Sequence, residues 1–343
     1  MRKFVWLALA AALLASLIAG WLALRFLQSP VTVPGDGLTY EIRPGTPFAV
    51  ISRELGELGV ISHPDLFRWY ARLAGDADRV HAGEYRIRAG TTPKGLLETF
   101  VSGNVILHAF TIVEGWTFRN LVDSLAAHPA IEPTVDPDDW PTLQDALDAE
   151  ADHPEGMFLP ETYRFPRHTR DLEILRRSYE MMQSTLGAAW DSRAEGLPLA
   201  TPYQALILAS IVEKETARPD ERARIAGVFV RRLQKGMRLQ TDPTVIYGAG
   251  RDFDGNITRR DLRTDTPYNT YTRSGLPPTP IALPGRAAIE ATLNPAAGTE
   301  LYFVASGLGD GSHEFSETKE EHDAAVRRYL MRLREARSAS GDR

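Results

Sequence analysis

Residues 202–216 read PYQALILASIVEKET, and this stretch specifies the core of a folded domain. Pro202 suits the first turn of a helix, where a missing N–H leaves no hydrogen bond unmade. Residues 206–212 are apolar apart from Ser210, and a helix that is apolar on every side lies buried. The stretch therefore predicts a buried central helix.

Two carboxylates, Glu213 and Glu215, end this helix. Residues two apart on a helix are separated by about 200° and face in opposite directions. Glu215 continues the bulkier apolar face formed by Leu208, Ile211 and Val212. A carboxylic acid held against apolar groups has a raised pKa, which suits a general acid near neutral pH. The alternative is a charged helix end in solvent.

Two segments that follow carry side chains suited to a sugar site. Residues 237–248 read MRLQTDPTVIYG and contain a proline-kinked turn, and residues 267–281 read PYNTYTRSGLPPTPI, a proline-stiffened loop. Amides and hydroxyls can pair with sugar hydroxyls, and aromatic rings can cover the apolar face of a sugar. The alternative is a pair of ordinary proline-rich loops. The candidate binding residues are Gln240, Asp242, Tyr247, Asn269 and Tyr271.

Two further carboxylates are candidates for binding or supporting roles. Glu161 lies in an aromatic stretch, GMFLPETYRF at 156–165, which we expect to be a loop, and Glu213 lies beside Glu215. Asp242 and Glu161 could instead be structural.

Histidines near the C-terminus offer a weak metal signal. His313, His322 and Glu321 fit no common metal-binding spacing, so we expect a surface or glycan-rim role for His313 and neither a metal nor a cofactor. Ser316 and Lys319 match an SxxK pattern without its usual SDN or KTG partners, and helix capping accounts for the match.

The composition is that of an ordinary globular protein. The 343 residues include 39 Lys and Arg against 45 Asp and Glu, a formal net charge of −6. We expect no nucleic-acid partner, because proteins that bind nucleic acid usually show a basic domain or stripe. The sequence contains no cysteine, which excludes disulfides, thiol nucleophiles and cysteine-bound metal sites.

A run without charge extends from Phe4 to Leu24 and follows Arg2 and Lys3. A helix of that length spans roughly 30 Å, the thickness of bilayer hydrocarbon, whereas a cleaved signal peptide has an apolar core of about 7–15 residues. The run favours an uncleaved anchor with a cytoplasmic N-terminus over a long signal peptide. Either way, the chain beyond it lies outside the cytoplasmic membrane.

A pattern repeats three times after this run, as YEIRPG at 40–45, YRIRAG at 85–90 and FTIVEG at 110–115. Each copy predicts a short strand, a turn at the glycine and a helix. Another amphipathic helix, over 64–74, lies between the first two copies. A strand–helix–helix–strand unit of this size resembles a LysM-like module, a fold that holds glycan chains. The alternative is an α+β spacer without a ligand.

Helical patterns cover much of the remaining chain. Residues 126–143, rich in Pro, Asp and Thr, predict a linker or the edge of a lobe. A hairpin is expected over 301–316. Further helices are expected over 171–186, 191–197, 223–233 and 317–336.

Three motifs carry a family resemblance: LASIVEKET at 208–216, RLQKGMRLQTDPTVIYG at 232–248 and YNTYTRSGLPP at 268–278. They resemble the YceG-like endolytic murein transglycosylases, the MltG family, and the similarity extends from the anchor to about residue 335. In that family the catalytic acid is the second glutamate of the EKET segment, which corresponds to Glu215. One departure is the loop GLPPTPIALPG at 275–285, which has Thr279 where the family pattern GLPPG has a glycine and Leu283 where it has a small residue, and we expect this loop to tune the rim of the cleft.

The fold class implied is α+β: a single N-terminal transmembrane helix, a LysM-like small module and a mixed α/β catalytic domain. The expected boundaries are a cytoplasmic tip at 1–3, the anchor at 4–27, the module at 28–107, the catalytic domain at 108–335 and a disordered tail at 336–343. The resemblance implies a single-pass inner-membrane protein with a periplasmic catalytic domain. Peptidoglycan strands would be its substrate and peptidoglycan synthases its partners.

The reaction implied by the resemblance is cleavage, without water, of the β-1,4 bond between N-acetylmuramic acid (MurNAc) and N-acetylglucosamine (GlcNAc). It would leave 1,6-anhydroMurNAc ends within nascent strands and terminate their elongation. Glu215 would protonate the leaving oxygen and then take the proton of the muramic C6 hydroxyl. No second nucleophilic carboxylate is needed, unlike in the usual glycosidase scheme.

Other interpretations stay open at this point. A non-catalytic, membrane-anchored scaffold would bind peptidoglycan through the repeat, with Glu213 and Glu215 as surface charges. An ordinary glycan hydrolase would use Asp242 or Glu161 to activate water. A peptidoglycan amidase or peptidase is poorly supported, because the sequence shows no zinc signature, no cysteine and no Ser-His-Asp constellation.

Overall fold

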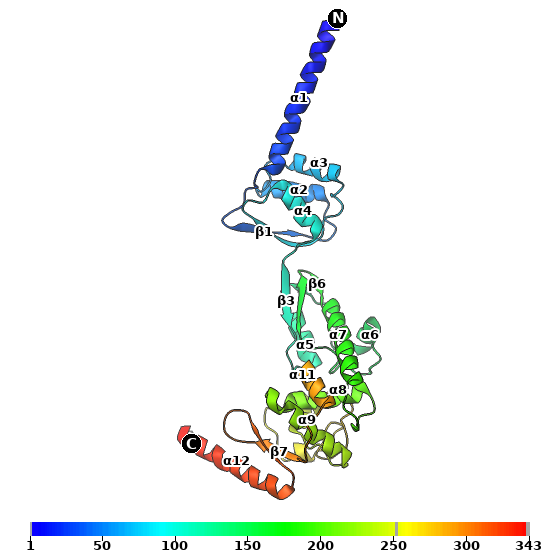
Figure 1. The fold of residues 1–343 in the computed structure, drawn as a ribbon, viewed down its shortest axis with the longest axis vertical. Coiled ribbons are helices and arrows are strands. Elements are labelled where there is room, and N and C mark those ends of the chain that lie inside the picture. Colours follow the sequence, from blue (N-terminus) through cyan, green and yellow to red (C-terminus); the bar gives the residue numbers. More distant parts are fainter. Residues whose placement is uncertain (1, 251–252, 341–343) are drawn as a thin grey trace. The chain divides into compact units, whose positions relative to one another are not determined.

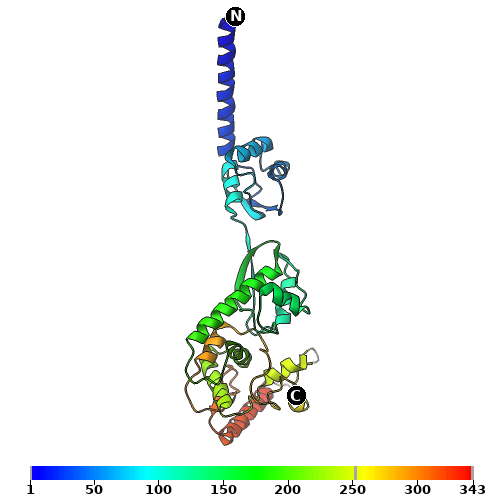
Figure 2. The ribbon, with the colours of Figure 1, turned by 90° about the vertical axis from the view of Figure 1, so that its right-hand side faces the viewer.

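The computed structural model describes residues 2–250 and 253–340. The chain divides into two compact units, the first made of Met1–His108 and Arg164–Thr169 and the second of Ala109–Tyr163 and Arg170–Arg343. Both units contain helices and strands (Figures 1 and 2). The chain is therefore a mixed α/β protein with an apolar helix at its N-terminus.

The apolar run forms α1 (Arg2–Gln28). Its segment Lys3–Gln28 is long and apolar enough to cross a membrane, and none of its most apolar window is buried within the described residues. Near its C-terminal end, Phe26 is buried and packs into the core of the first unit. A membrane anchor and a signal sequence share this length and composition.

The first unit has the strand–helix–helix–strand order expected from the repeat. β1 pairs with β2 in antiparallel register, so that Tyr40 lies opposite Tyr85. Both tyrosines are buried in one core with Phe67 and Phe100, and Tyr85 donates its hydroxyl to the carbonyl of His81 at 2.7 Å. The elements after α1 are β1 (Gly37–Ile42), α2 (Phe48–Glu57), α3 (Pro64–Ala74), β2 (Gly83–Arg88) and α4 (Pro93–Ser102).

The glycines of the three repeats occupy the predicted turns. Gly45, Gly90 and Gly115 have φ angles of 76°, 85° and 77°. This left-handed region is open to glycine because it lacks a Cβ. Each glycine thus lets a strand turn into the helix that follows.

The rest of the chain is mainly helical, with short two-stranded sheets. β3 pairs with β5, β4 with β6, and β7 with β8. The elements are β3 (Leu107–Thr111), α5 (Phe118–Ala126), β4 (Ile131–Glu132), α6 (Trp140–Leu147), β5 (Thr162–Pro166), β6 (Thr169–Arg170), α7 (Asp171–Asp191), α8 (Pro202–Glu215), α9 (Pro219–Gln234), α10 (Asp242–Ala249), η2 (Asp261–Arg263), α11 (Arg286–Leu293), β7 (Tyr302–Ala305), β8 (His313–Ser316) and α12 (Lys319–Ser340).

Helix α8 is the core of the second unit, as its sequence predicts. The Thr201 side chain caps its first turn by accepting a hydrogen bond from the Gln204 N–H. Every residue from Ala205 to Val212 is buried, and α7, α9 and α11 pack around the helix (Figures 1 and 2). The C-terminal end of α8, with its two glutamates, is therefore held on a rigid element.

Several local predictions were wrong. The helix expected over 191–197 is absent because α7 ends at Asp191, and Gly196 turns the chain with a φ of 74°. Thr162–Pro166 is a strand instead of a loop. The expected kinked turn after Gln240 is the helix α10, because Pro243 lies in its first turn, where proline is tolerated.

Two boundaries differ from the expected organisation. The segment expected as a linker over 126–143 contains the start of α6 at Trp140. Helix α12 continues to Ser340, into the region expected as a disordered tail. Residue 1 of the expected tip and residues 341–343 of the expected tail lie outside the described residues.

Candidate active site

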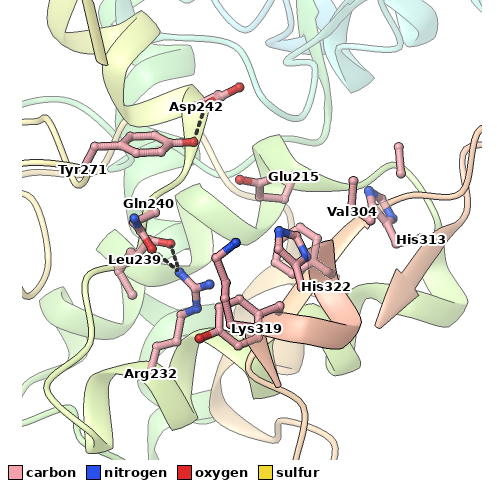
Figure 3. A pocket seen from close by; sticks show the side chains of 13 residues that line it. Glu215, Arg232, Leu239, Gln240, Asp242, Tyr271, Val304, His313, Lys319 and His322 are labelled. Carbon is pink, nitrogen blue, oxygen red and sulfur yellow. Dashed lines mark hydrogen bonds between the residues drawn. The ribbon is translucent and has the colours of Figure 1, made fainter. Parts of the chain in front are cut away.

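Glu215 lies at the C-terminal end of α8 and lines a cavity of about 520 Å³. The opposite walls come from the segment between α9 and α10, from Tyr271, from the β7–β8 hairpin and from the start of α12 (Figure 3). Side chains far apart in the sequence thus meet around one partly buried carboxylate.

The surroundings of Glu215 favour its protonated form. Burial raises the pKa of Glu215, and the nearby charge of Asp242 raises it further. The hydroxyl of Thr241, which donates to Glu215 Oε1, lowers that pKa, as do the charges of His313 and Arg232. Desolvation is the largest effect, so this carboxyl group can hold a proton at a higher pH than an exposed glutamate.

A buried network of threonines fixes the group that touches Glu215. The Thr241 N–H donates to Thr270 Oγ1 at 3.1 Å, and the hydroxyls of Thr244 and Thr270 pair at 2.9 Å. Thr244 also donates its hydroxyl to the carbonyl of Thr241 at 2.7 Å. Because all three threonines are buried, Thr241 is held in one position against Glu215.

Three of the predicted binding residues line the same cavity: Gln240, Asp242 and Tyr271. The Tyr271 hydroxyl donates to Asp242 Oδ1 at 2.5 Å. Gln240 has a φ of 53°, a conformation that is strained for a residue with a Cβ and that tends to cluster at functional sites. Arg232 Nη1 supports it by donating to Gln240 Oε1 at 3.3 Å (Figure 3).

Tyr247 and Asn269 point elsewhere. The Tyr247 hydroxyl donates to Glu155 Oε2 at 3.0 Å. Asn269 is buried, and its side-chain amide donates to the carbonyl of Thr264 at 2.7 Å, while its Oδ1 accepts from the Tyr271 N–H at 2.9 Å. Asn269 thus holds the loop that presents Tyr271.

Glu213 and Glu161 also lie outside the lining of this cavity. Glu213 Oε2 accepts the Gly285 N–H at 2.9 Å, and burial raises the pKa of Glu213 too. Glu161 is exposed, and its carboxylate accepts the N–H of Thr162 at 2.8 Å. The two glutamates of α8 therefore have different surroundings, as the helix geometry predicts, but neither is an ordinary solvent charge.

Sequence reasoning missed the wall formed by Arg232, Tyr302, Lys319 and His322, all of which line the cavity. Arg232 begins the motif RLQKGMRLQTDPTVIYG, and its sequence pattern indicates only a helix. Lys319 ends the SxxK pattern at 316–319, which helix capping explains. The hairpin and α12 that carry the other residues lie about 100 residues beyond Glu215. No local pattern signals such a distant partner.

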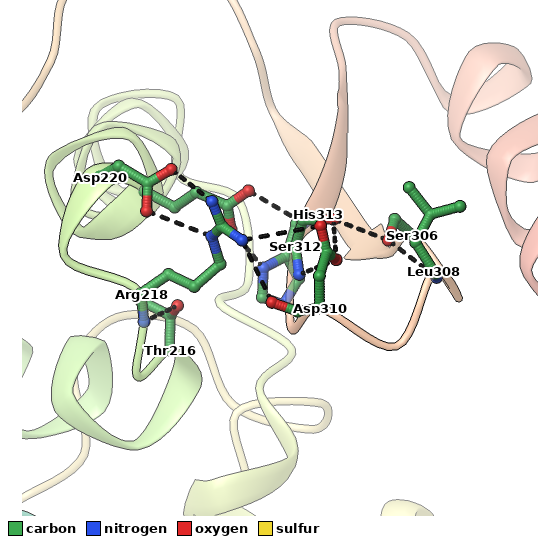
Figure 4. Close-up of polar contacts among 9 residues, drawn as sticks. Thr216, Arg218, Asp220, Ser306, Leu308, Asp310, Ser312 and His313 are labelled. Carbon is green, nitrogen blue, oxygen red and sulfur yellow. Dashed lines mark hydrogen bonds and ion pairs between the residues drawn. The ribbon is translucent and has the colours of Figure 1, made fainter.

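Polar contacts tie the hairpin to the segment that follows Glu215 (Figure 4). The Arg218 guanidinium binds the carboxylate of Asp220 and donates to the carbonyl of Asp310 at 3.1 Å. His313 binds Glu221 through its N–H at 3.0 Å and its Nδ1 at 2.7 Å. These contacts bring His313 to the cavity, in keeping with the rim role expected for it.

The described residues contain no group of three or more His, Cys, Asp or Glu side chains placed to hold a metal ion.

Comparisons with known proteins identify the family of the chain. The model of the YceG-like family matches residues 40–328, which include Glu215 and the cavity residues named above. The chain belongs to the YceG-like family. It is 30% identical over 307 residues to a Bacillus subtilis protein named endolytic murein transglycosylase, covering 84% of each chain. A Streptococcus pneumoniae protein of the same name is 28% identical over 327 residues, which are 85% of this chain and 58% of that one.

A solved YceG-like structure has a related fold. The 2.6 Å crystal structure of a YceG-like protein from Listeria monocytogenes matches with a TM-score of 0.53 and 29% sequence identity. The match covers 84% of this chain and 99% of the Listeria chain. The YceG-like fold thus extends over most of the chain.

Thr279, the departure from the YceG-like pattern, does not line the cavity of Glu215. It lines a separate cavity with Tyr203, and its hydroxyl pairs with that of Tyr268 at 2.9 Å. The physical reason is that Ser210, within α8, accepts the N–H of Ile281 at 3.0 Å. This contact holds the loop against the body of the helix, and the expected effect on the rim of the cleft stays a prediction.

Proposed function

We propose that this YceG-like protein is a lytic transglycosylase that cleaves the MurNAc–GlcNAc β-1,4 bond within peptidoglycan glycan strands and leaves 1,6-anhydroMurNAc ends. The observation that carries the proposal is Glu215, a carboxyl group whose pKa is raised by burial and which faces a cavity of about 520 Å³. The relatives named endolytic murein transglycosylase support the same activity.

In the proposed reaction one carboxyl group performs both proton transfers. Protonated Glu215 gives its proton to the glycosidic oxygen of GlcNAc while the bond from that oxygen to the muramic C1 breaks. C1 is left as an oxocarbenium-like or oxazolinium centre. Ionised Glu215 then takes the proton of the muramic C6 hydroxyl, whose oxygen bonds to C1. Glu215 ends protonated, and no water is consumed.

The neighbours of Glu215 have complementary roles in this proposal. Thr241, which donates to Glu215 Oε1, aims the carboxyl group and stabilises its ionised form between the two steps. Gln240 and Tyr271 line the cavity beside it and bind sugar hydroxyls and a sugar face. Asp242 accepts the Tyr271 hydroxyl, so it orients that ring.

Product analysis tests the proposal. Uncrosslinked glycan strands are incubated with the detergent-solubilised protein or with Glu215→Gln, and fragments are identified by mass spectrometry. We expect internal fragments with 1,6-anhydro ends from the wild type and their loss in the variant. Reducing ends would indicate a hydrolase instead. Intact strands that remain bound would favour the non-catalytic scaffold.

The same proposal includes a cellular setting. We infer that α1 anchors the protein in the inner membrane with its N-terminus in the cytoplasm, that residues 28–107 form a LysM-like glycan-holding module, and that cleavage terminates strands made by associated synthases. The chain has no cysteine, so a single exposed Ser192→Cys would be its only thiol. A membrane-impermeant maleimide should label it from the periplasmic side. Labelling only after membrane lysis would show that the domain faces the cytoplasm, the opposite of the proposed orientation.

A further inference from the structure

The cavity has two chemically different walls. Glu215 and Asp242 supply carboxylates on one side, while Arg232, Lys319 and His322 supply cations or a potential cation on the other. The proposed reaction assigns no group of the substrate to the cationic wall, which these three residues define.

Arg232 is buried, yet its bonding partners are neutral. Its Nε donates to the carbonyl of Leu301 at 2.6 Å, and its Nη1 donates to the carbonyls of Arg238 and Leu239 at 3.0 and 2.8 Å. None of these hydrogen bonds goes to a carboxylate, although the Arg232 charge lies near enough to Glu215 to lower the pKa of that carboxyl group. Its positive charge can also attract an anion that enters the cavity.

Lys319 is held only by an exposed pair. Its ammonium contacts Asp323 one helical turn away, and the two side chains are 57% and 47% exposed. Exposed pairs of this kind contribute little stability, so exchange of Asp323 for another anion costs little. Figure 3 shows the Lys319 side chain rising between Arg232 and His322 toward the cavity.

His322 carries an unused polar atom. Its Nδ1 is buried and has no hydrogen-bond partner within the described part of the chain, while its ring stacks on Tyr302 with centroids 5.2 Å apart. Burial lowers the pKa of His322, and the charges of Lys319 and Arg232 contribute to the lowering. The ring of His322 therefore adds a third basic group to the wall that Arg232 and Lys319 form.

We infer that the cationic wall is a subsite for a carboxylate carried by the muramic acid residue of the substrate. Lys319 supplies a mobile ammonium, His322 a hydrogen-bond donor and Arg232 a fixed positive charge. His313 has no part in it, because it is committed to Glu221. The carboxylate belongs either to the stem peptide or, where the peptide has been removed, to the lactyl group. This inference rests on the proposed transglycosylase function.

The subsite predicts that substrates are selected by charge. Gln240 and Tyr271 can bind a neutral sugar without help from the cationic wall. The three basic groups of that wall add nothing to the binding of a neutral sugar. A carboxylate gains charge-assisted hydrogen bonds, which are roughly twice as strong as neutral ones. The protein should therefore prefer strands with a carboxylate near the scissile bond.

The test compares three strands with the full-length protein in detergent. One carries stem peptides, one has been stripped by an amidase and carries lactyl carboxylates, and one is stripped and then converted to neutral lactyl amides. Wild type should show kcat/KM about tenfold higher on a carboxylate-bearing strand than on the neutral strand, the effect of one charge-assisted hydrogen bond. The better of the two charged strands identifies the source of the carboxylate.

Variants at Lys319 test whether this residue causes the preference for charged strands. Because this side chain is exposed, Lys319→Gln should fold, and its ratio between charged and neutral strands should fall to near one, while Lys319→Arg should restore it. The matched control, Lys235→Gln, removes an exposed lysine outside the cavity and should keep the wild-type ratio. An unchanged ratio in Lys319→Gln, or a wild type that cleaves neutral strands equally well, would overturn the subsite. Absence of anhydro products from every strand would instead overturn the proposed function.

Discussion

Glu155, which is buried, and Glu215, which is partly buried, are two carboxylates of the second unit with different surroundings. Glu155 is 3% exposed, and burial raises its pKa to about 7. Its oxygens are occupied by the Phe118 N–H at 2.9 Å and the Tyr247 hydroxyl at 3.0 Å. Glu215 also has a raised pKa, but it lines a cavity of about 520 Å³. A raised pKa alone therefore does not make a catalytic acid, because the group must also reach a substrate.

The largest expected effect is at Glu215. Glu215→Gln removes the proton donor and base but keeps the size of the side chain, so kcat should fall about 10²–10⁴-fold, the usual value of general acid–base catalysis. Anhydro-product formation measures it. A Glu215→Gln variant with wild-type kcat would show that Glu215 is no more a catalytic acid than Glu155.

Thr241 should show the next largest effect on rate. Thr241→Val keeps the shape but deletes the hydroxyl that donates to Glu215, and kcat should fall at least about tenfold, as for the loss of a hydrogen bond to a charged group. That hydroxyl lowers the pKa of Glu215, so its loss should raise this pKa.

A pH profile separates this positioning role from simple misfolding. The acid step needs protonated Glu215, so kcat declines as pH rises through its pKa. In Thr241→Val the declining limb should move to higher pH. A lower kcat with an unmoved limb would contradict the role, and Thr241→Ser, which keeps the hydroxyl, should restore the wild-type profile.

Glu155→Gln should change stability and leave activity close to wild type. The folded pKa of Glu155 is about 7 against an ordinary value of 4.5, so the folded protein holds an extra proton between these values. Stability should therefore decline as pH rises from 4.5 to 7, by at most about 3 kcal/mol from this group. Urea unfolding at several pH values should show a flatter profile in the variant, and equal slopes in both proteins would contradict the assignment.

The smallest effect is expected at Glu213, the partner of Glu215 on α8. Glu213→Gln keeps an oxygen that can accept the Gly285 N–H, and the group lies outside the cavity lining. Rate and pH profile should both stay near wild type. A loss as large as that of Glu215→Gln would show that the helix geometry selects the wrong glutamate.

Much of the second unit could be predicted from local sequence. The apolar run 205–212 is long enough to specify a buried helix, and the spacing of Glu213 and Glu215 assigns them to different sides. The glycine turns at Gly45 and Gly90 of the first unit and at Gly115 of the second also follow from local chemistry, because each needs a left-handed residue.

The rest depends on distant contacts. Tyr247 is a residue type that often binds sugars, but its hydroxyl donates a hydrogen bond to Glu155, which lies about 90 residues earlier in the chain. Lys319 and His322 join the cavity only because the hairpin is tied to Arg218 and Glu221. Loop amides mislead for a similar reason, since the Asn269 side chain satisfies backbone carbonyls instead of facing the cavity.

The central claim is that Glu215 transfers the proton twice and that water takes no part in bond cleavage. The most direct test runs the reaction in heavy-oxygen water and weighs the new ends of the strands by mass spectrometry. We predict 1,6-anhydro ends that contain no heavy oxygen. Reducing ends that carry one heavy oxygen each would contradict the account and identify the protein as a hydrolase.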